Sequence, residues 1–356
     1  MEFGSEQVIV TGAGGWLGRN FVRALLHGLP DHPALRAPDA RVRLRCLLAP
    51  GEDAAELTAL SERVEPVVGD LAYPDACRAL FAGTRGAVAF HLAGIIHPRR
   101  VREFYRVNVQ GTETLLAAAR EARARRVVAM SSNSPFGTNP HAEHLFDEHS
   151  PYRPYLHYGR SKMQMEQAVA RAGAESAAGG LETVLIRAPW FYGPWQPPRQ
   201  SVFFTMIRQG KGPIVGGGEN RRSMSYVDNL SQGLLLAALT PAAAGRAYWI
   251  ADRRPYTMNE IVDTVERLLE REFGLSVAHK RLRLPGLASA VAYACDWTLQ
   301  SLGRYHQKLH VLGELNKSIA CSVARAKAEL DYRPAVALEE GMRRSIRWCL
   351  EHGIAI

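Results

Sequence analysis

Short apolar runs alternate with helix-length stretches along the first half of the chain, and this alternation limits the fold more than any other feature. The runs are rich in Val, Leu and Ala, as strands buried on both faces require. The predicted strands are 7–11, 42–48, 64–68, 87–94, 126–132 and 181–189, and the longest predicted helices are 102–121 and 158–174. Repeated strand–helix alternation predicts an α/β protein with a doubly wound parallel sheet.

A glycine-rich turn, TGAGGWLG at 11–18, joins the first predicted strand to the first helix. Gly12, Gly15 and Gly18 have the spacing that permits a tight turn and lets backbone N–H groups approach a pyrophosphate. The pyrophosphate then lies at a helix N-terminus, where the helix dipole favours negative charge. The chain is therefore predicted to bind a dinucleotide on a Rossmann-type sheet.

The strand–helix alternation ends after the sixth predicted strand and returns only briefly. Residues 226–252 provide a helical run and a strand-like AYWIAD, which we expect to rejoin the sheet. We predict a dinucleotide-binding Rossmann domain over 6–189 that this segment completes. Residues 190–225 and 253–356 lack the alternation and should form a smaller, mostly helical substrate-binding lobe at the C-terminal ends of the strands.

The end of the second predicted strand leaves the choice between NAD and NADP open. A carboxylate there binds the ribose 2′-hydroxyl of NAD, whereas an arginine suits the 2′-phosphate of NADP. The position itself holds Ala49. Arg19 and Arg45 are near enough in sequence to serve a phosphate, and Glu52 and Asp53 follow slightly late for a hydroxyl.

Two other places carry polar side chains at chemically useful positions. Asp70 ends the third predicted strand and is either an acceptor for the adenine amine or a solvated loop acid. Tyr158 and Lys162, in YGRSK, lie on one face of a predicted helix because their spacing is i, i+4. A nearby ammonium lowers the pKa of a phenol from about 10 and makes it an acid or base near neutral pH. The alternative is an ordinary surface pair on an amphipathic helix.

Charge and cysteine usage exclude several classes of function. The formal net charge of +9 is carried by 38 arginines and 6 lysines, without a basic block interleaved with aromatic residues. We therefore expect no nucleic-acid partner, and the excess suits an anionic small molecule. The five cysteines are scattered and predict no metal site and a reducing compartment, so we expect a cytoplasmic protein. No apolar run reaches the ~18 residues that a transmembrane segment needs.

Several motifs occur in an order that is typical of one family. They are TGxxGxxG, GDL at 69–71, HLAG at 91–94, VNVQGT at 107–112, the two serines before PFG, YxxxK, and RAPWFYGP at 187–194. In this order they resemble the extended short-chain dehydrogenase/reductase superfamily, in its NAD-dependent epimerase/dehydratase branch. The resemblance implies that Ser132, Tyr158 and Lys162 are the catalytic residues and that Asn108 supports them.

The same resemblance implies a cofactor site, a substrate site and a dimer. NAD or NADP would contact Gly12, Gly15, Trp16, Leu17, Gly18, Asp70, Leu71, Leu92, Ala93, Asn108, Ser131, Tyr158, Lys162 and Pro189. We interpret the Ser131 hydroxyl as structural, satisfying backbone groups at the strand end. The substrate would contact Ser132, Asn133, Ser134, Trp190 and Arg222. Family members form homodimers through the helices near 102–121 and 158–174.

The residues at positions 133 and 134 limit which reactions of the family this chain can catalyse. Dehydratases of this family carry an Asp-Glu pair directly after the catalytic Ser or Thr, whereas this chain has Asn133 and Ser134, which cannot act as acid or base near pH 7. Elimination and decarboxylation are therefore disfavoured. Simple oxidation or reduction of an alcohol or ketone remains, as does 4-epimerisation.

Residues of the predicted substrate lobe favour two different classes of substrate. Arg222, in GGGENRRSMSYVDN, matches a family arginine that binds a nucleotide diphosphate, but Trp190 stands where such members have Asn. The apolar segment 283–303 resembles the variable lobe of 3β-hydroxysteroid-dehydrogenase-like and β-keto-acid reductases. We expect this segment to form part of the core of the small lobe. Two alternatives remain: it covers a hydrophobic substrate, or it contacts a membrane surface.

Three hypotheses about function follow. The first is a nucleotide-sugar 4-epimerase or 4-ketoreductase. The second is a 3β-hydroxysteroid-dehydrogenase-like or β-keto reductase of a hydrophobic substrate. The third is a non-catalytic NAD(P)-binding sensor, which the presence of Ser132, Tyr158 and Lys162 disfavours.

Overall fold

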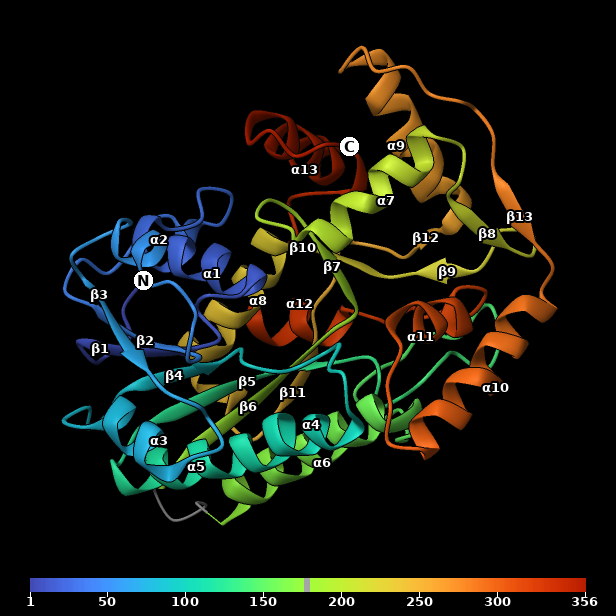
Figure 1. The fold of residues 1–356 in the computed structure, drawn as a ribbon. Coiled ribbons are helices and arrows are strands. Elements are labelled where there is room, and N and C mark those ends of the chain that lie inside the picture. Colours follow the sequence, from blue (N-terminus) through green and yellow to red (C-terminus); the bar gives the residue numbers. More distant parts are fainter. Residues whose placement is uncertain (176–179) are drawn as a thin grey trace.

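The computed structural model describes residues 1–175 and 180–356, with a seven-stranded sheet at the centre (Figure 1). Every strand pairs in parallel with its neighbours, in the order β11-β6-β5-β4-β1-β2-β3. The strands are β1 Gln7–Thr11, β2 Arg43–Leu48, β3 Val64–Val68, β4 Val88–His91, β5 Arg126–Ser132, β6 Glu182–Ala188 and β11 Ala247–Trp249. The predicted doubly wound parallel sheet is confirmed.

Strand order reverses between β1 and β4. The chain runs outward from β1 through β2 and β3, then crosses back to β4 on the other side of β1. In open α/β sheets, ligands bind at such a reversal, beyond the carboxyl ends of the strands. The predicted glycine-rich turn and the HLAG motif both lie at this edge, since they directly follow or complete β1 and β4.

Two helical layers cover the sheet (Figure 1). Helices α1, α8 and α12 lie on one face and helices α3, α5 and α6 on the other, each layer with its own apolar cluster. These helices are α1 Trp16–His27, α3 Pro74–Phe81, α5 Gly111–Glu121, α6 Leu156–Ala174, α8 Val227–Leu239 and α12 Ala324–Leu330. Segment 226–252 contributes α8 and β11, and α12, from the last hundred residues, packs over β11.

The long helix predicted over 102–121 has three parts. Helix α4 (Val101–Phe104) passes into a π-helical segment (Tyr105–Gln110), which α5 continues. A π-helix is rare and occurs frequently at functional sites, because it re-aims side chains within an otherwise regular helix. Here it contains Asn108, which the sequence predicts to support the catalytic residues.

A smaller lobe stands beyond the C-terminal ends of the strands. It is mostly helical, with three two-stranded sheets that pair β7 with β10, β9 with β12 and β8 with β13. Its strands are β7 Trp190–Tyr192, β8 Pro213–Val215, β9 Arg221–Arg222, β10 Met224–Tyr226, β12 Tyr256–Thr257 and β13 Leu282–Leu284. Its helices are α7 Pro198–Arg208, α9 Met258–Arg271, α10 Leu287–Ser301, α11 Gln307–Glu314 and α13 Leu338–Glu351.

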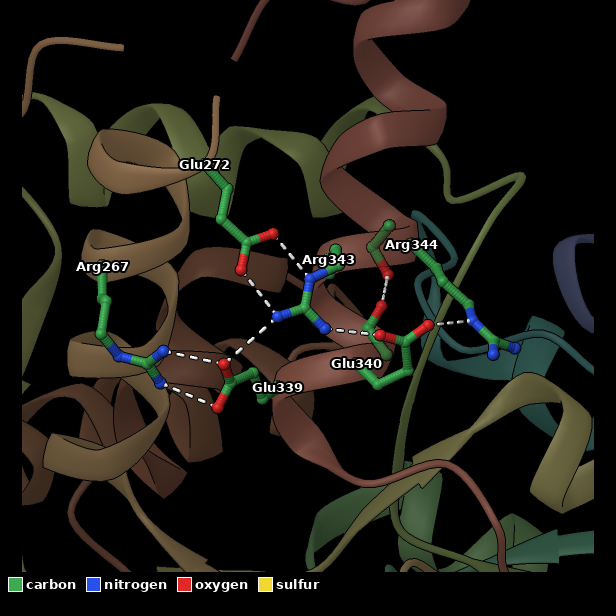
Figure 2. A network of polar contacts seen from close by, with 8 residues as sticks. Arg267, Glu272, Glu339, Glu340, Arg343 and Arg344 are labelled. Carbon is green, nitrogen blue, oxygen red and sulfur yellow. Dashed lines mark hydrogen bonds and ion pairs between the residues drawn. The ribbon is translucent and has the colours of Figure 1, made fainter. Parts of the chain in front are cut away.

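Ion pairs join α9 to α13 at the surface of this lobe (Figure 2). The Arg343 guanidinium lies between three carboxylates and donates to Glu272, Glu339 and Glu340, at 2.6 Å from Glu272 Oε2. Arg267 donates to both oxygens of Glu339. These bonds lower the pKa of each glutamate, with the Arg343 hydrogen bond as the main cause at Glu272. The network adds to the apolar packing between the two helices.

Candidate active site

The glycine-rich turn is closed so tightly that side chains cannot fit. Gly12 has a φ of +71°, and a Cβ there would lie 2.7 Å from the Ala93 nitrogen. A Cβ on Gly18 would collide with the Gly12 carbonyl oxygen. Gly15 precedes α1, and no side chain caps the N–H groups of the first turn. This arrangement fits a dinucleotide pyrophosphate, which needs free backbone donors and close backbone approach.

The side chains of Trp16 and Leu17, in the same turn, are both engaged within the protein. The Trp16 indole nitrogen donates to the Pro194 carbonyl oxygen at 2.7 Å, and Asn20 donates to the same oxygen at 3.0 Å. Leu17 is buried in the apolar core. The Trp16 side chain therefore connects helix α1 to the segment around Pro194 that leads into the small lobe.

Although the sequence places Ala49 at the end of β2, the Glu52 carboxylate lies there. Glu52 turns back toward the strand, and its Oε2 accepts from the Ala49 N–H at 2.8 Å. A Cβ on Gly14 would lie 3.0 Å from the same oxygen, so the carboxylate stands beside the glycine-rich turn. Arg19 and Arg45 are each in an ion pair with a glutamate elsewhere. The end of β2 thus presents a carboxylate, and the two arginines near it in sequence are paired with other glutamates.

Asp70 is engaged by an arginine from the π-helical segment. Its Oδ2 accepts from Arg106 at 2.5 Å, and its Oδ1 accepts from the Ala72 N–H at 3.0 Å. Burial alone would raise the pKa of Asp70, but the Arg106 and Ala72 bonds lower it overall. The neighbouring Leu71 packs against Gly111. Asp70 is thus a bound, charged acid at the end of β3 rather than a freely solvated one.

A buried hydrogen-bonded chain connects β1, β4 and the helix that carries Asn108. The Thr112 hydroxyl donates to the Asn108 carbonyl oxygen, so it must accept from His91 Nε2–H at 2.8 Å. His91 Nδ1 then accepts from the Thr11 hydroxyl, which accepts in turn from the Ala93 N–H. Burial, followed by the charge of Lys162, lowers the pKa of His91 to about 3, which keeps the ring neutral.

Asn108 fixes the loop that follows β4. Its Oδ1 accepts from the Ile95 N–H at 2.8 Å, and its Nδ2 donates to the Ile95 carbonyl oxygen and to Ser161 Oγ. A Cβ on Gly94 would lie 3.3 Å from Asn108 Oδ1 and 4.0 Å from Lys162 Nζ. The loop containing Leu92 and Ala93, the π-helical segment and the predicted catalytic lysine therefore meet at one point.

Ser132 and Tyr158 meet because α6 approaches the loop after β5 closely. A Cβ on Gly159 would lie 2.4 Å from the Ser134 carbonyl oxygen. The Ser134 N–H donates to Ser132 Oγ at 3.1 Å, which leaves the Ser132 proton free to be donated. Ser132 forms a hydrogen bond with Tyr158 as well. Two hydroxyl groups thus face the same space at the end of β5.

The pKa of Tyr158 differs from the value expected from its spacing to Lys162. Burial raises the pKa of Tyr158 to about 12, although the Ser132 hydrogen bond acts in the opposite direction. Burial lowers the pKa of Lys162 to about 8, and its Nζ donates to the Met130 carbonyl oxygen at 2.7 Å. The prediction that the Lys162 ammonium lowers the pKa of Tyr158 is not met, because desolvation of the phenolate outweighs the Ser132 hydrogen bond and Lys162 does not act on Tyr158.

Ser131 has a structural role, but with a different partner from the one expected. Its hydroxyl donates to Glu166 Oε1 at 2.6 Å rather than to backbone groups. Glu166 is fully buried, and Arg187 contacts both of its oxygens. The Tyr152 hydroxyl donates to Glu166 Oε2 at 2.8 Å. Only the backbone of Ser131 is left to contact a cofactor.

The small lobe places unpaired polar atoms beside Tyr158. Arg222 is 8% exposed, and its Nη2 donates to the Glu314 carbonyl oxygen at 2.5 Å. Three buried atoms here have no hydrogen-bond partner in the described chain, namely Arg222 Nε, Glu314 Oε1 and the Tyr155 hydroxyl. Glu314 also raises the pKa of Tyr158 through its charge. Such unsatisfied groups need partners, and a bound substrate would supply them.

Aromatic rings pack against one another around Trp190 and around Tyr158. Trp190 lies at the start of β7, directly after the buried Pro189, and its ring centroid is 5.6 Å from that of Phe203. The ring centroid of Phe104 lies 5.6 Å from that of Tyr158 and 5.3 Å from that of Tyr305. The predicted substrate residues Asn133 and Ser134 occupy the turn after Ser132. The surroundings of Tyr158 therefore combine an aromatic ring with the charge of the Glu314 carboxylate.

Comparison with protein families decides the family of the chain. The model of the NAD dependent epimerase/dehydratase family matches residues 8–251. The chain belongs to this family. It is an enzyme of the extended short-chain dehydrogenase/reductase type, as its motifs predict. An uncharacterised protein of Sinorhizobium fredii is 51% identical over 347 residues, which cover 97% of this chain and 96% of that protein.

Two other members of this epimerase/dehydratase family have named activities. A 4-hydroxy-2-methyl-3-oxo-4-farnesyl-3,4-dihydroquinoline-1-oxide ketoreductase of Stigmatella aurantiaca is 31% identical, over 72% of this chain and 71% of the relative. The dTDP-glucose 4,6-dehydratase DesIV of Streptomyces venezuelae, solved with NAD bound, is 25% identical. The two structures superimpose with a TM-score of 0.72 over 97% of each chain.

The epimerase/dehydratase site also contains residues that sequence reasoning missed. His91 and Thr112 stand inside the HLAG and VNVQGT motifs, so the motifs could have indicated them. Glu314 and Tyr305 belong to the variable lobe and carry no motif. His310, bound through Nδ1 to the buried Asp296 at 2.8 Å, packs against Tyr305. Among the described residues no group of His, Cys, Asp and Glu could hold a metal ion.

Proposed function

We propose that this protein transfers a hydride between NAD and a secondary alcohol or ketone carbon. The observation that carries the proposal is the meeting of Ser132, Tyr158, Lys162 and Asn108 beside the glycine-rich turn. Tyr158 gives or takes the hydroxyl proton, and Ser132 donates a hydrogen bond to the reacting oxygen. Lys162 binds the nicotinamide ribose, and Asn108 holds the loop beside it. The nicotinamide supplies or accepts the hydride when it is bound.

A nucleotide-linked sugar is our first candidate substrate, acted on by 4-epimerisation or 4-ketoreduction. Arg222 supports it, since this buried guanidinium has an Nε without a hydrogen-bond partner among the described residues and suits a diphosphate. Asn133 and Ser134 argue against dehydration, because neither side chain can remove or add a proton near neutral pH.

A hydrophobic ketone is the second candidate. Trp190 and Phe203 supply aromatic surface at β7 and α7, and the Glu314 carboxylate, whose charge acts on Arg222, would repel a diphosphate. The ketoreductase of Stigmatella aurantiaca, whose named substrate carries a farnesyl group, supports this candidate.

Thermal unfolding in the presence of NAD separates the two candidates. UDP- or dTDP-glucose should raise the melting temperature of the wild type, and Arg222→Gln should abolish that rise while keeping the rise caused by NAD. A rise with a steroid ketone alone would replace the first candidate with the second. No rise with any ligand other than NAD, together with no turnover, would support the non-catalytic sensor instead.

We also propose that the enzyme prefers NAD to NADP. The Glu52 carboxylate at the end of β2 would repel a 2′-phosphate and can accept from a 2′-hydroxyl. Glu52→Gln keeps an acceptor for the Ala49 N–H and removes the charge. We expect it to reduce the preference for NADH over NADPH about 5–30-fold, the ratio that 1–2 kcal/mol produces. Tighter binding of NADPH by the wild type in a fluorescence titration would refute this assignment.

The homodimer and the cytoplasmic location stay predictions. The large exposed apolar side chains of the described chain lie outside 102–121 and 158–174, the helices through which family members would pair. Light scattering on a sizing column would measure the oligomeric state directly.

A further inference from the structure

Helix α10 presents an apolar face to solvent. Leu287, Val291 and Trp297 on the helix and Leu302 just beyond it are 71%, 55%, 55% and 73% exposed. We call these four residues the α10 face. Seven of the thirteen large apolar side chains exposed in the described chain fall within residues 282–311. The expectation that segment 283–303 forms lobe core is therefore wrong for this side of the helix, because an apolar composition alone cannot distinguish burial from exposure.

The opposite side of α10 shows why the helix is held in place. Ser289, Ala292, Asp296 and Gln300 are buried at helical spacing against α11 and α6. Asp296 accepts from His310 and Gln300, and it is the only charged residue of the helix. Figure 1 shows α10 at the outer edge of the molecule, beside α11. The helix is thus anchored on one side and free of charge on the other.

Basic residues flank both ends of the α10 face. Lys280 and Arg283 precede the helix, Arg304 follows it, and Arg100 forms an isolated β-bridge with Arg304. All four are exposed, and none has a carboxylate partner among residues 1–175 and 180–356. The nearest acid to Arg100, Glu103, accepts from the backbone N–H groups of residues 99 and 100 instead. Arginines elsewhere, such as Arg343, are surrounded by carboxylates (Figure 2).

We propose that the α10 face adsorbs to the surface of a lipid bilayer that contains anionic lipids. An apolar face with a tryptophan and flanking cations is the composition of interfacial helices, which bury the apolar side at the headgroup boundary. The cations add attraction to anionic headgroups. No helix in the described part of the chain is long and apolar enough to span a bilayer.

Adsorption would place the pocket next to the lipid. Tyr293, on α10, has its ring centroid 5.5 Å from that of Tyr155, whose buried hydroxyl has no hydrogen-bond partner among the described residues. Tyr305 and Glu314 of the pocket lie just before and at the end of α11, the helix packed on α10. A substrate with a lipid chain could then reach Tyr158 from the membrane surface. The membrane contact itself is independent of the substrate and of catalysis.

Vesicle flotation of the full chain tests this proposal. The wild type should float with vesicles of phosphatidylcholine mixed with phosphatidylglycerol, and less with phosphatidylcholine alone or at high salt. Trp297→Glu/Leu302→Glu should reduce binding to mixed vesicles at least ~10-fold, since two buried apolar side chains are lost. Arg100→Glu/Arg304→Glu should remove the preference for phosphatidylglycerol. Val68→Glu and Arg85→Glu, exposed positions elsewhere, are the controls.

Several outcomes would overturn the proposal. One is a wild type that stays unbound with the mixed vesicles. Another is an α10 variant that binds as tightly as the Val68→Glu control. A third is loss of self-association in the α10 variants on a sizing column without loss of flotation, because the face would then bind a second copy. Leu287→Glu provides an independent variant, and circular dichroism checks that each protein is folded.

Discussion

Replacing Tyr158 with Phe should lower kcat about 10²–10⁴-fold and leave the affinity for NADH unchanged. The loss has the size expected when a positioned general acid or base is removed. The phenylalanine keeps the ring that packs 5.6 Å from Phe104, so the pocket wall is preserved. Turnover is followed through the absorbance of NADH, and NADH affinity through its fluorescence.

The matched control for this variant is Tyr73→Phe, which removes the hydroxyl of an exposed tyrosine at the start of α3. It should retain wild-type turnover. Ser132→Ala should also be impaired, because the reacting oxygen loses its hydrogen-bond donor. Equal turnover in wild type and Tyr158→Phe would contradict the assignment of Tyr158 and favour a binding protein.

The second large effect concerns stability. Glu166→Ala should reduce the free energy of unfolding by ~3–5 kcal/mol, the cost of leaving one partner of a buried ion pair alone. Arg187 is 6% exposed and would keep an unpaired charge beside the Phe136 ring, 4.4 Å away. The Tyr152 and Ser131 hydroxyls would lose their acceptor as well. Denaturant unfolding measures the change.

Two further variants show whether the pair itself or the orphaned charge causes the loss. Glu175→Ala removes an acid that pairs with Arg120 at the surface, where both side chains are about half exposed. It should change stability by no more than ~1 kcal/mol. The double variant Glu166→Leu/Arg187→Met should recover part of the loss, because no charge is left buried. A loss below ~1 kcal/mol in Glu166→Ala would show that the buried pair contributes little.

The sheet was predictable because its signal is local. Strands predicted at 42–48 and 181–189 begin and end within one residue of β2 and β6, since apolar runs between turn residues define them. The π-helical segment was not predictable from periodicity. It forms where Asn108 bonds to Ile95, a contact that depends on how the two elements pack. The two- and three-residue strands of the small lobe, such as β9, are too short to show a period.

In the candidate site, residues within motifs could be predicted from the sequence, whereas contacts between residues far apart in the sequence could not. The motifs predict Ser132, Tyr158 and Lys162, and the structure brings them together beside β5. It also shows that Glu166 holds Ser131 and that Glu314 faces the pocket from more than 150 residues away. Nothing in the local sequence indicates such contacts.

The most direct test of the central claim is single-turnover hydride transfer. Enzyme saturated with NAD is mixed with the alcohol identified by the melting experiments, carrying hydrogen or deuterium at the carbinol carbon. We predict a rise in the absorbance of reduced nicotinamide that is slower for the deuterated alcohol and about 10²–10⁴-fold slower in Tyr158→Phe. The same rise in Tyr158→Phe, or turnover without any reduced nicotinamide, would contradict the account.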